Sequence, residues 1–187
     1  MVGFLLVALL GAGAASTPAP AQSAAPAANA PAPAADAWAA MRFLLGDWVG
    51  EGGGDPGSGS GSFSFRFDLG EKVIVRRDHS EYPRGGGAAP IVHDGLMVVY
   101  PETEDGALAA VYFDNEGHVI RYRTQLGEGG QSVVFLSEAA PSSPRFRLAY
   151  SRVDEDTVEV RFSIAPPGRP DAFKLYLGGR CRRIRKG

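Results

Sequence analysis

Residues 62–67 read SFSFRF, and this stretch has the two-residue period of a β-strand with one buried face. Phenylalanine alternates with polar residues, with Phe63, Phe65 and Phe67 set against Ser62, Ser64 and Arg66. Successive side chains of a strand point to opposite faces, so the pattern predicts that the three rings lie in a core. The same period recurs through most of the chain, which makes this stretch the guide to the fold.

A glycine-rich segment, GDWVGEGGGDPGSGSG at residues 46–61, runs into this strand. Gly52, Gly54 and Gly57 satisfy the G-x-G-x-x-G spacing of dinucleotide-binding loops, but that spacing requires a following helix whose N-terminus faces the phosphates. A strand follows instead, and no lysine follows a glycine as it does in a P-loop. We therefore interpret the glycines as a long hairpin connection.

Period-two patterns separated by turn residues predict the strands of the fold. The predicted strands cover residues 47–52, 61–69, 71–81, 91–100, 107–113, 118–126, 131–138, 145–153, 156–165 and 171–183. Only residues 38–45 have a helical pattern, with Asp36 as the candidate N-cap. We predict an all-β fold, an up-and-down antiparallel β-barrel of about ten strands with a short N-terminal helix, because closure removes exposed strand edges.

Alternation also predicts which side chains face the interior of this barrel. The inward apolar sets are Phe146, Leu148 and Tyr150, then Val158, Val160, Phe162 and Ile164, and then Phe173, Leu175 and Leu177. An outer-membrane barrel would alternate in the opposite sense, but the basic end RCRRIRKG and the lack of an aromatic girdle argue against it. We interpret those terminal arginines and lysine as a solvated strand face.

Several polar residues fall on predicted inward faces and are the candidate ligand-binding residues. In the predicted strand 71–81, Val73 and Val75 face inward, and the two-residue period then turns Arg77 and His79 inward as well. In the predicted strand 118–126, Arg121 and Arg123 should face water, so His118 and Tyr122 on the other face should point inward. The candidate ligand-binding residues are Arg77, His79, Tyr112, His118, Tyr122 and Tyr150. The alternatives are a rim ion pair for Arg77, with Glu81 as partner, and purely structural roles for the histidines.

The N-terminal segment has the composition of a secretory signal. Residues 1–21 contain a short apolar run followed by small residues, which predicts a signal peptide too short to be a transmembrane helix. Residues 22–35 are rich in alanine and proline and predict a disordered tether, so the predicted barrel domain covers residues 36–187. This places the mature protein in the periplasm or outside the cell, with no integral membrane segment after cleavage.

Charge and cysteine content limit the classes of partner. A formal net charge of −2 argues against nonspecific binding of nucleic acid. Cys181 is the only cysteine, so no intramolecular disulfide can form. Spacings such as H-x-x-x-H or C-x-x-C are missing from the sequence, and we expect no bound metal.

The segment FLLGDWVGEG at residues 43–52 runs a short helix into the pattern G-x-W-x-G-x-G, formed by Gly46, Trp48, Gly50 and Gly52. It resembles the entry to lipocalin-like, or calycin, barrels, and the nitrobindin-type ten-stranded barrel most closely. With FDNEGHVIRY and FKLYLGGR it is also similar to exported bacterial lipocalin-like domains of unknown function. The resemblance implies that Trp48 packs across the closed end, and that Gly50 and Gly52 let the first strand bend at a corner.

Nitrobindin-like proteins bind haem through a histidine near the C-terminus, and this sequence has none there. Haem binding is therefore not carried over, and we expect no cofactor. Two functions agree with the sequence. One is binding or carriage of a small, mostly apolar or amphipathic ligand inside the barrel, with an acid as the ligand if Arg77 and His79 line the interior. The other is a cofactor-free decarboxylase, cyclase or isomerase that uses inward tyrosine and arginine side chains.

Overall fold

The structure is a computed structural model that describes residues 35–51, 60–103 and 107–185. The predicted signal peptide, the tether up to residue 34 and the predicted hairpin glycines at 52–59, Gly52 among them, lie outside these residues. The described part begins with a short helix, α1 (Ala35–Met41), and one turn of 3-10 helix, η1 (Arg42–Leu44).

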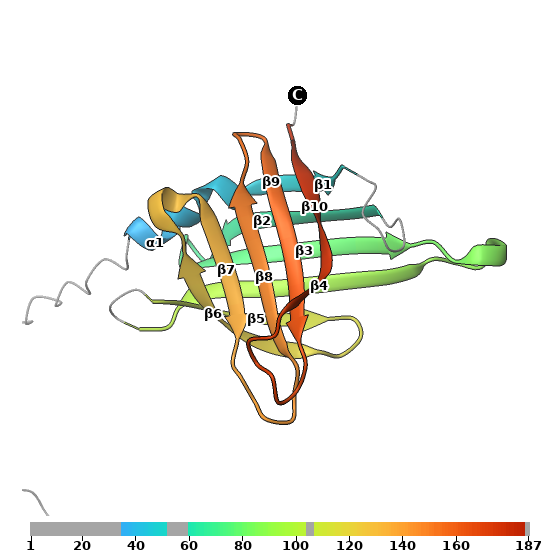
Figure 1. Cartoon of the computed structure of the whole chain (residues 1–187). Coiled ribbons are helices and arrows are strands. Elements are labelled where there is room, and N and C mark those ends of the chain that lie inside the picture. The colour runs from blue at the N-terminus through green and yellow to red at the C-terminus, as the bar shows by residue number, and fades with distance from the viewer. Residues whose placement is uncertain (1–34, 52–59, 104–106, 186–187) are drawn as a thin grey trace, which may run out of the picture. The chain divides into compact units, whose positions relative to one another are not determined.

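Ten strands of the described chain form one closed antiparallel barrel, so the predicted all-β, up-and-down architecture is confirmed (Figure 1). The strands are β1 (Gly46–Gly50), β2 (Ser60–Asp68), β3 (Val73–Tyr82), β4 (Ile91–Pro101), β5 (Leu108–Asp114), β6 (Val119–Leu126), β7 (Ser132–Ser137), β8 (Arg145–Arg152), β9 (Thr157–Ala165) and β10 (Lys174–Ile184). Each strand pairs with its neighbours in sequence, and β1 pairs with β10 to close the barrel. This architecture is compatible with a lipocalin-like fold and with ligand binding.

The core lies between two walls of the barrel, with β1 to β4 crossing β7 to β10 in Figure 1. Phe63 and Phe65 of β2 are buried as their alternation predicts, and both rings pack edge-on against Tyr150 with centroid distances of 5.4 Å. Tyr150 and Phe135 are fully buried and extend the aromatic cluster to the opposite wall. Large rings from both walls thus fill the middle of the barrel.

Trp48 and Arg183 close one end of the barrel. The indole of Trp48 is fully buried, stacks on Phe63 and donates a hydrogen bond of 2.8 Å to the carbonyl of Leu44 in η1. The Arg183 guanidinium lies 4.2 Å from the centre of the indole and donates to the carbonyls of Phe43 and Leu45. Arg180, Arg182 and Arg185 are exposed, as the interpretation of a solvated basic face predicts. Arg183 is the exception, since it packs under the helix.

The first residues of β10 depart from the predicted alternation. The register with β9 shifts between Leu175 and Leu177, so Tyr176 forms a bulge. Leu175 is 56% exposed, and Phe173 lies beneath the Arg147 guanidinium, 4.4 Å from ring centre to carbon. The predicted inward placement of Phe173 and Leu175 is therefore wrong, because the bulge breaks the two-residue period on which it depended.

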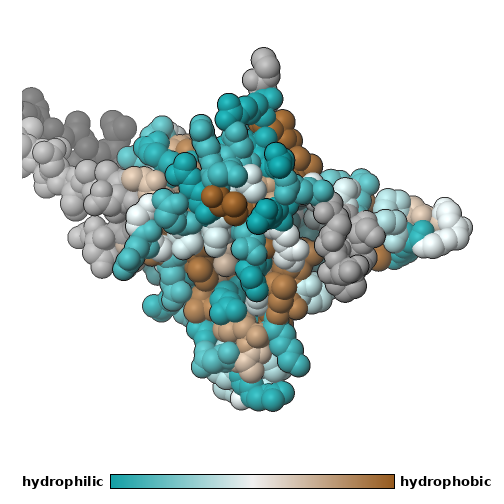
Figure 2. Space-filling model, turned by 45° about the horizontal axis from the view of Figure 1, so that its top comes forward, coloured by the Kyte–Doolittle hydropathy of each residue, from teal (hydrophilic) through white to brown (hydrophobic). Residues whose placement is uncertain are grey.

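The surface carries apolar side chains in small groups between charged ones, as Figure 2 shows for one face. In the described residues, no helix has the length and apolar composition needed to span a membrane.

Replacing Trp48 with alanine should lower the free energy of unfolding by about 3–5 kcal/mol, because a cavity replaces a fully buried ring. Urea titration followed by circular dichroism measures the change. Val49→Ala is the matched control, since Val49 is the next residue of β1 and is 42% exposed. Equal losses in the two variants would show that the indole does not hold the closed end.

Candidate functional site

The inward face of β3 carries Ile74, Arg76 and Asp78, which is the opposite face from the predicted one. Ile74 is fully buried and Arg76 is 8% exposed, whereas Arg77 and His79 are exposed. Arg76 pairs with Phe65 and Asp78 with Phe63, and paired residues share a face of the sheet. The predicted inward orientation of Arg77 and His79 is therefore wrong.

A buried ion pair lies on this inward face. The Arg76 guanidinium donates through Nη1 to the Asp78 carboxylate, and the two side chains are only 9% and 11% exposed. Burial lowers the pKa of Arg76, but Tyr150 and Asp78 raise it more, so the pKa lies above its ordinary value and the group stays charged. An ion pair this deep places a permanent dipole inside an aromatic core.

Three tyrosines surround the pair: Tyr112 on β5, Tyr122 on β6 and Tyr150 on β8. All three face inward as predicted from alternation, and burial is the main cause that raises the pKa of each phenol above its usual value. Each hydroxyl is therefore neutral and keeps its proton at physiological pH. The interior thus offers a guanidinium and three phenols, with the Asp78 carboxylate beside the guanidinium and the buried Asp114 carboxylate close to Tyr112.

Three buried polar atoms in this interior have no hydrogen-bond partner among the described residues: Arg76 Nε, Thr124 Oγ1 and Tyr150 Oη. The Tyr150 hydroxyl lies close enough to the Arg76 guanidinium for a side-chain hydrogen bond to contribute to the pKa shifts of both groups, but the contact lacks the geometry of a full hydrogen bond and leaves the two groups incompletely satisfied. A buried polar group without a partner costs about 1–3 kcal/mol, so such groups are rare unless something else satisfies them.

Gly95 on β4 makes room for the carboxylate and for one tyrosine. It pairs with Asp78, and a Cβ added to it would collide with Asp78 Oδ1 and lie 2.7 Å from Tyr112 Oη. Both oxygens therefore point at the same space above Gly95. Neither the sequence pattern nor the predicted turns identified this residue.

The end of the barrel away from α1 is largely apolar and less deeply buried than the middle. Inward-facing Tyr112, Ile120, Phe146 and Phe162 pack against the core but stay partly exposed, and we call this group the open end. Phe146 and Phe162 stack with their rings 6.0 Å apart.

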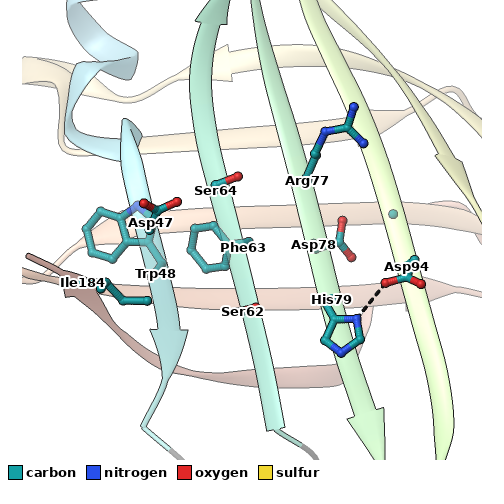
Figure 3. Close-up of a pocket in the computed structure, with 11 residues that line it drawn as sticks. Asp47, Trp48, Ser62, Phe63, Ser64, Arg77, Asp78, His79, Asp94 and Ile184 are labelled. Atoms are coloured by element: carbon teal, nitrogen blue, oxygen red, sulfur yellow. Dashed lines mark hydrogen bonds and ion pairs between the residues drawn. The ribbon is translucent and has the colours of Figure 1, made fainter. Parts of the chain in front are cut away.

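Arg77 and His79 line a shallow hollow of about 440 Å³ on the outer surface of β1 to β4 (Figure 3). The small side chains of Ser62 and Ser64 form its floor. His79 bonds to Asp94 (Nδ1 to Oδ1, 2.7 Å) and to Glu81 (Nε2 to Oε1, 3.2 Å), and these bonds raise its pKa. This hollow is wide and exposed, and His79 is already paired with two carboxylates. Arg77 makes no ion pair among the described residues, and the alternative of a rim pair with Glu81 is wrong because Glu81 bonds to His79.

His118 precedes β6 and is 61% exposed, so its predicted inward orientation is wrong. The residue belongs to the turn after β5, where Asp114 accepts hydrogen bonds from the backbone N–H groups of Glu116 (3.0 Å) and His118 (2.9 Å). The His118 ring also bonds to Asp114 at 2.9 Å. The period-two count failed here because His118 is a turn residue, whereas Ile120 and Tyr122 of the strand face inward.

The other residues singled out in the sequence have structural positions. Gly46 has a φ of +117° and lies against the Arg183 side chain, where a Cβ would be 2.9 Å from Nη1. Gly50 sits at the end of β1 beside Gly61. Burial raises the pKa of the Cys181 thiol to about 11, so the thiol is protonated at neutral pH. Within residues 35–51, 60–103 and 107–185, no three histidine, cysteine, aspartate or glutamate side chains are grouped to hold a metal ion.

Comparison with models of protein families gives no match to this chain, and comparison with curated proteins gives none either.

Replacing Arg76 alone with methionine should destabilise the fold by about 3–5 kcal/mol, because Asp78 would stay buried without its cation. Adding Asp78→Leu should restore most of the lost stability, since apolar side chains can replace a buried ion pair. Thermal unfolding of the single and double variants measures both effects. Arg77→Met is the matched control and should change the stability by less than about 0.5 kcal/mol; a larger loss for Arg77→Met than for Arg76→Met would contradict the assignment of faces.

The stabilisation from Asp114 should depend on pH. Burial alone would raise the pKa of Asp114, but hydrogen bonds from His118 and Glu116 outweigh it and hold the pKa below 3.8. A carboxyl with a depressed folded pKa stabilises the fold above its unfolded pKa, and this contribution is lost as the pH falls through the folded value. The melting temperature of Asp114→Asn should therefore lie below that of the parent protein near neutral pH, and the difference should shrink as the pH falls below the ordinary pKa of an aspartate and through the lower folded value. Glu128→Gln, at an exposed position, serves as the control, and a pH-independent difference for Asp114→Asn would refute the linkage.

Proposed function

We propose that the barrel binds a small, mostly apolar ligand whose polar end is a carboxylate or another oxygen acceptor. The observation that carries the proposal is the set of buried polar atoms, Arg76 Nε and Tyr150 Oη above all, that make no hydrogen bond of good geometry in the described part of the chain. A ligand oxygen beside Arg76 would accept from Nε–H and from the phenol, and would satisfy both groups.

The charge arrangement supports an acceptor at this place. Asp78 occupies Nη1 of Arg76, and the guanidinium still has N–H groups to donate. Hydrogen bonds from a guanidinium to a carboxylate are stronger in a low-dielectric interior than in water. The dipole of the pair therefore favours a ligand that places its negative end on the arginine side.

The open end supports the apolar part of the ligand. Phe146 and Phe162 stack with each other and are only partly buried, so an apolar chain could cover their remaining exposed area. The middle of the barrel is occupied by the fully buried rings of Trp48, Phe65 and Phe135. We therefore place the ligand between the open end and Arg76, above this aromatic layer.

A cofactor-free enzyme is the second candidate function, and one observation favours it. Such a mechanism needs an inward carboxylate or base beside an arginine and a tyrosine, and Asp78 is an inward carboxylate paired with Arg76 and close to Tyr112. Binding of a ligand at Arg76 is the first step of either function.

Displacement of a neutral naphthalene fluorophore by decanoic acid, and separately by decanol, tests the proposal. The double variant Arg76→Met with Asp78→Leu should bind decanoic acid about 30-fold more weakly, or ~2 kcal/mol, because the guanidinium donors are lost. Decanol should bind equally well to both proteins, since it needs only the apolar surface.

Arg77→Met is the control for charge, because Arg77 lies on the outer face of the same strand. It should leave the affinity for decanoic acid within about twofold of the parent value. Equal weakening of acid and alcohol in the double variant would contradict recognition by Arg76. Failure of both compounds to displace the fluorophore from the parent protein would contradict ligand binding altogether.

A further inference from the structure

A chain of three hydrogen-bonded side chains runs from the surface to the interior at the open end. Glu116, in the turn after β5, contacts His93 Nδ1 at 3.0 Å through Oε1, and His93 Nε2 lies 2.8 Å from the hydroxyl of Tyr112. His93 is on the inward face of β4 with 26% of its side chain exposed, whereas Glu116 is 53% exposed. The chain therefore connects solvent with the inner wall of the barrel.

With the imidazole of His93 neutral, the chemistry of the three groups fixes the direction of the hydrogen bonds. An ionised carboxylate can only accept, so Nδ1 of His93 carries the proton that it shares with Glu116. Nε2 of the neutral ring is then an acceptor, and the Tyr112 hydroxyl donates to it. The lone pairs of the Tyr112 oxygen are left to face the interior.

Tyr112 ends this chain beside the proposed binding place. Its hydroxyl and Asp78 Oδ1 point at the same space above Gly95, and Asp78 is bonded to Arg76. A ligand whose oxygen lies on Arg76 would therefore hold its neighbouring atoms against the Tyr112 hydroxyl. The three groups stand in the order carboxylate, imidazole, hydroxyl. In this order a weakly basic hydroxyl can accept a proton, because the imidazole removes the proton that the hydroxyl already carries.

We propose that the Glu116–His93–Tyr112 chain removes a proton from the carbon next to a carbonyl group of a bound oxo acid. This inference rests on the proposed function, because Arg76 must first hold the carbonyl or carboxylate oxygen. Tyr112 is the catalytic residue, His93 receives the proton that Tyr112 passes on, and Glu116 positions the imidazole.

The step balances without any further reactant. The C–H bond breaks as its proton moves to Tyr112 Oη, while the Tyr112 proton moves to His93 Nε2 and produces an imidazolium paired with Glu116. The electron pair of the broken bond becomes the C=C bond of an enolate, and the negative charge rests on the oxygen at Arg76. Return of a proton along the same path restores the carbonyl compound, and no electrons are gained or lost.

The alternative is a purely structural role, in which the same hydrogen bonds only hold β4 against the turn after β5. That role predicts losses of stability in the variants but no chemistry, so the two roles differ in one measurement. Exchange of the C3 protons of 2-oxodecanoate in deuterium oxide, followed by proton NMR, reports the proposed step directly. Binding of decanoic acid, measured by fluorophore displacement, reports the site separately.

The parent protein should accelerate the exchange well above the rate in buffer, and Tyr112→Phe and His93→Gln should each reduce this acceleration by about 100-fold or more. The affinity of each variant for decanoic acid is measured alongside, and the exchange is compared at concentrations of 2-oxodecanoate that saturate each variant. His79→Gln is the matched control, because His79 also bonds to two carboxylates but lies on the outer face. It should leave the exchange unchanged.

Glu116→Gln covers the case in which the other variants do not fold, because Glu116 is exposed and its loss should not unfold the barrel. It should slow the exchange by about tenfold or more, since the imidazolium loses its counter-charge. Added imidazole should restore part of the exchange in His93→Gly but none in Tyr112→Phe, a result that a structural fastening would not produce.

Decanoic acid binding without any accelerated exchange would overturn this inference and leave the binding function standing. Exchange that persists in Tyr112→Phe and in Glu116→Gln would also overturn it. Absence of both binding and exchange in the parent protein would remove the proposed function together with the inference.

Discussion

The contact between the Trp48 indole and the Arg183 guanidinium joins the first and last strands of the barrel, and the rest of the structure depends on it. Trp48 and Arg183 are directly paired in the β1–β10 ladder, so the contact spans the seam where the sheet meets itself. The same arginine binds carbonyls on both sides of the end of η1, and the indole N–H binds a third. One cation–π pair therefore fixes both the closure of the sheet and the helical cover of its end.

The closed end allows the interior to hold a charge. Rings from β2, β7 and β8 exclude water around Arg76, and this exclusion strengthens its interactions with Asp78 and with any acceptor oxygen. The same exclusion makes each polar atom without a partner costly, so the pair and the phenols constrain what can enter the open end.

Most strands were predictable because one face of each is apolar, and their observed bounds differ from the predicted ones by only a few residues. The sequence VIVRRDHS of β3 was the exception, since its charged residues occupy both faces and alternation gives no phase. The phase depends on the turn before it. A turn of only three residues, Leu69, Gly70 and Glu71, would have paired Phe65 with Val75. In the structure the turn also includes Lys72, and Phe65 pairs with Arg76 instead. One extra turn residue reversed the faces of the strand and exchanged Arg77 for Arg76 in the interior.

Pairing of the first strand with the last also determines when the barrel can close during synthesis. Residues 47–50 can pair only with residues 181–184, which are synthesised last. Both edges of the growing sheet therefore stay unpaired until β10 has left the ribosome. Contacts this distant in sequence make folding slow, and unpaired edges recruit other chains during the delay. Any partner that held β1 apart from β10 would leave the sheet open at this seam, with both edge strands available to pair with other chains.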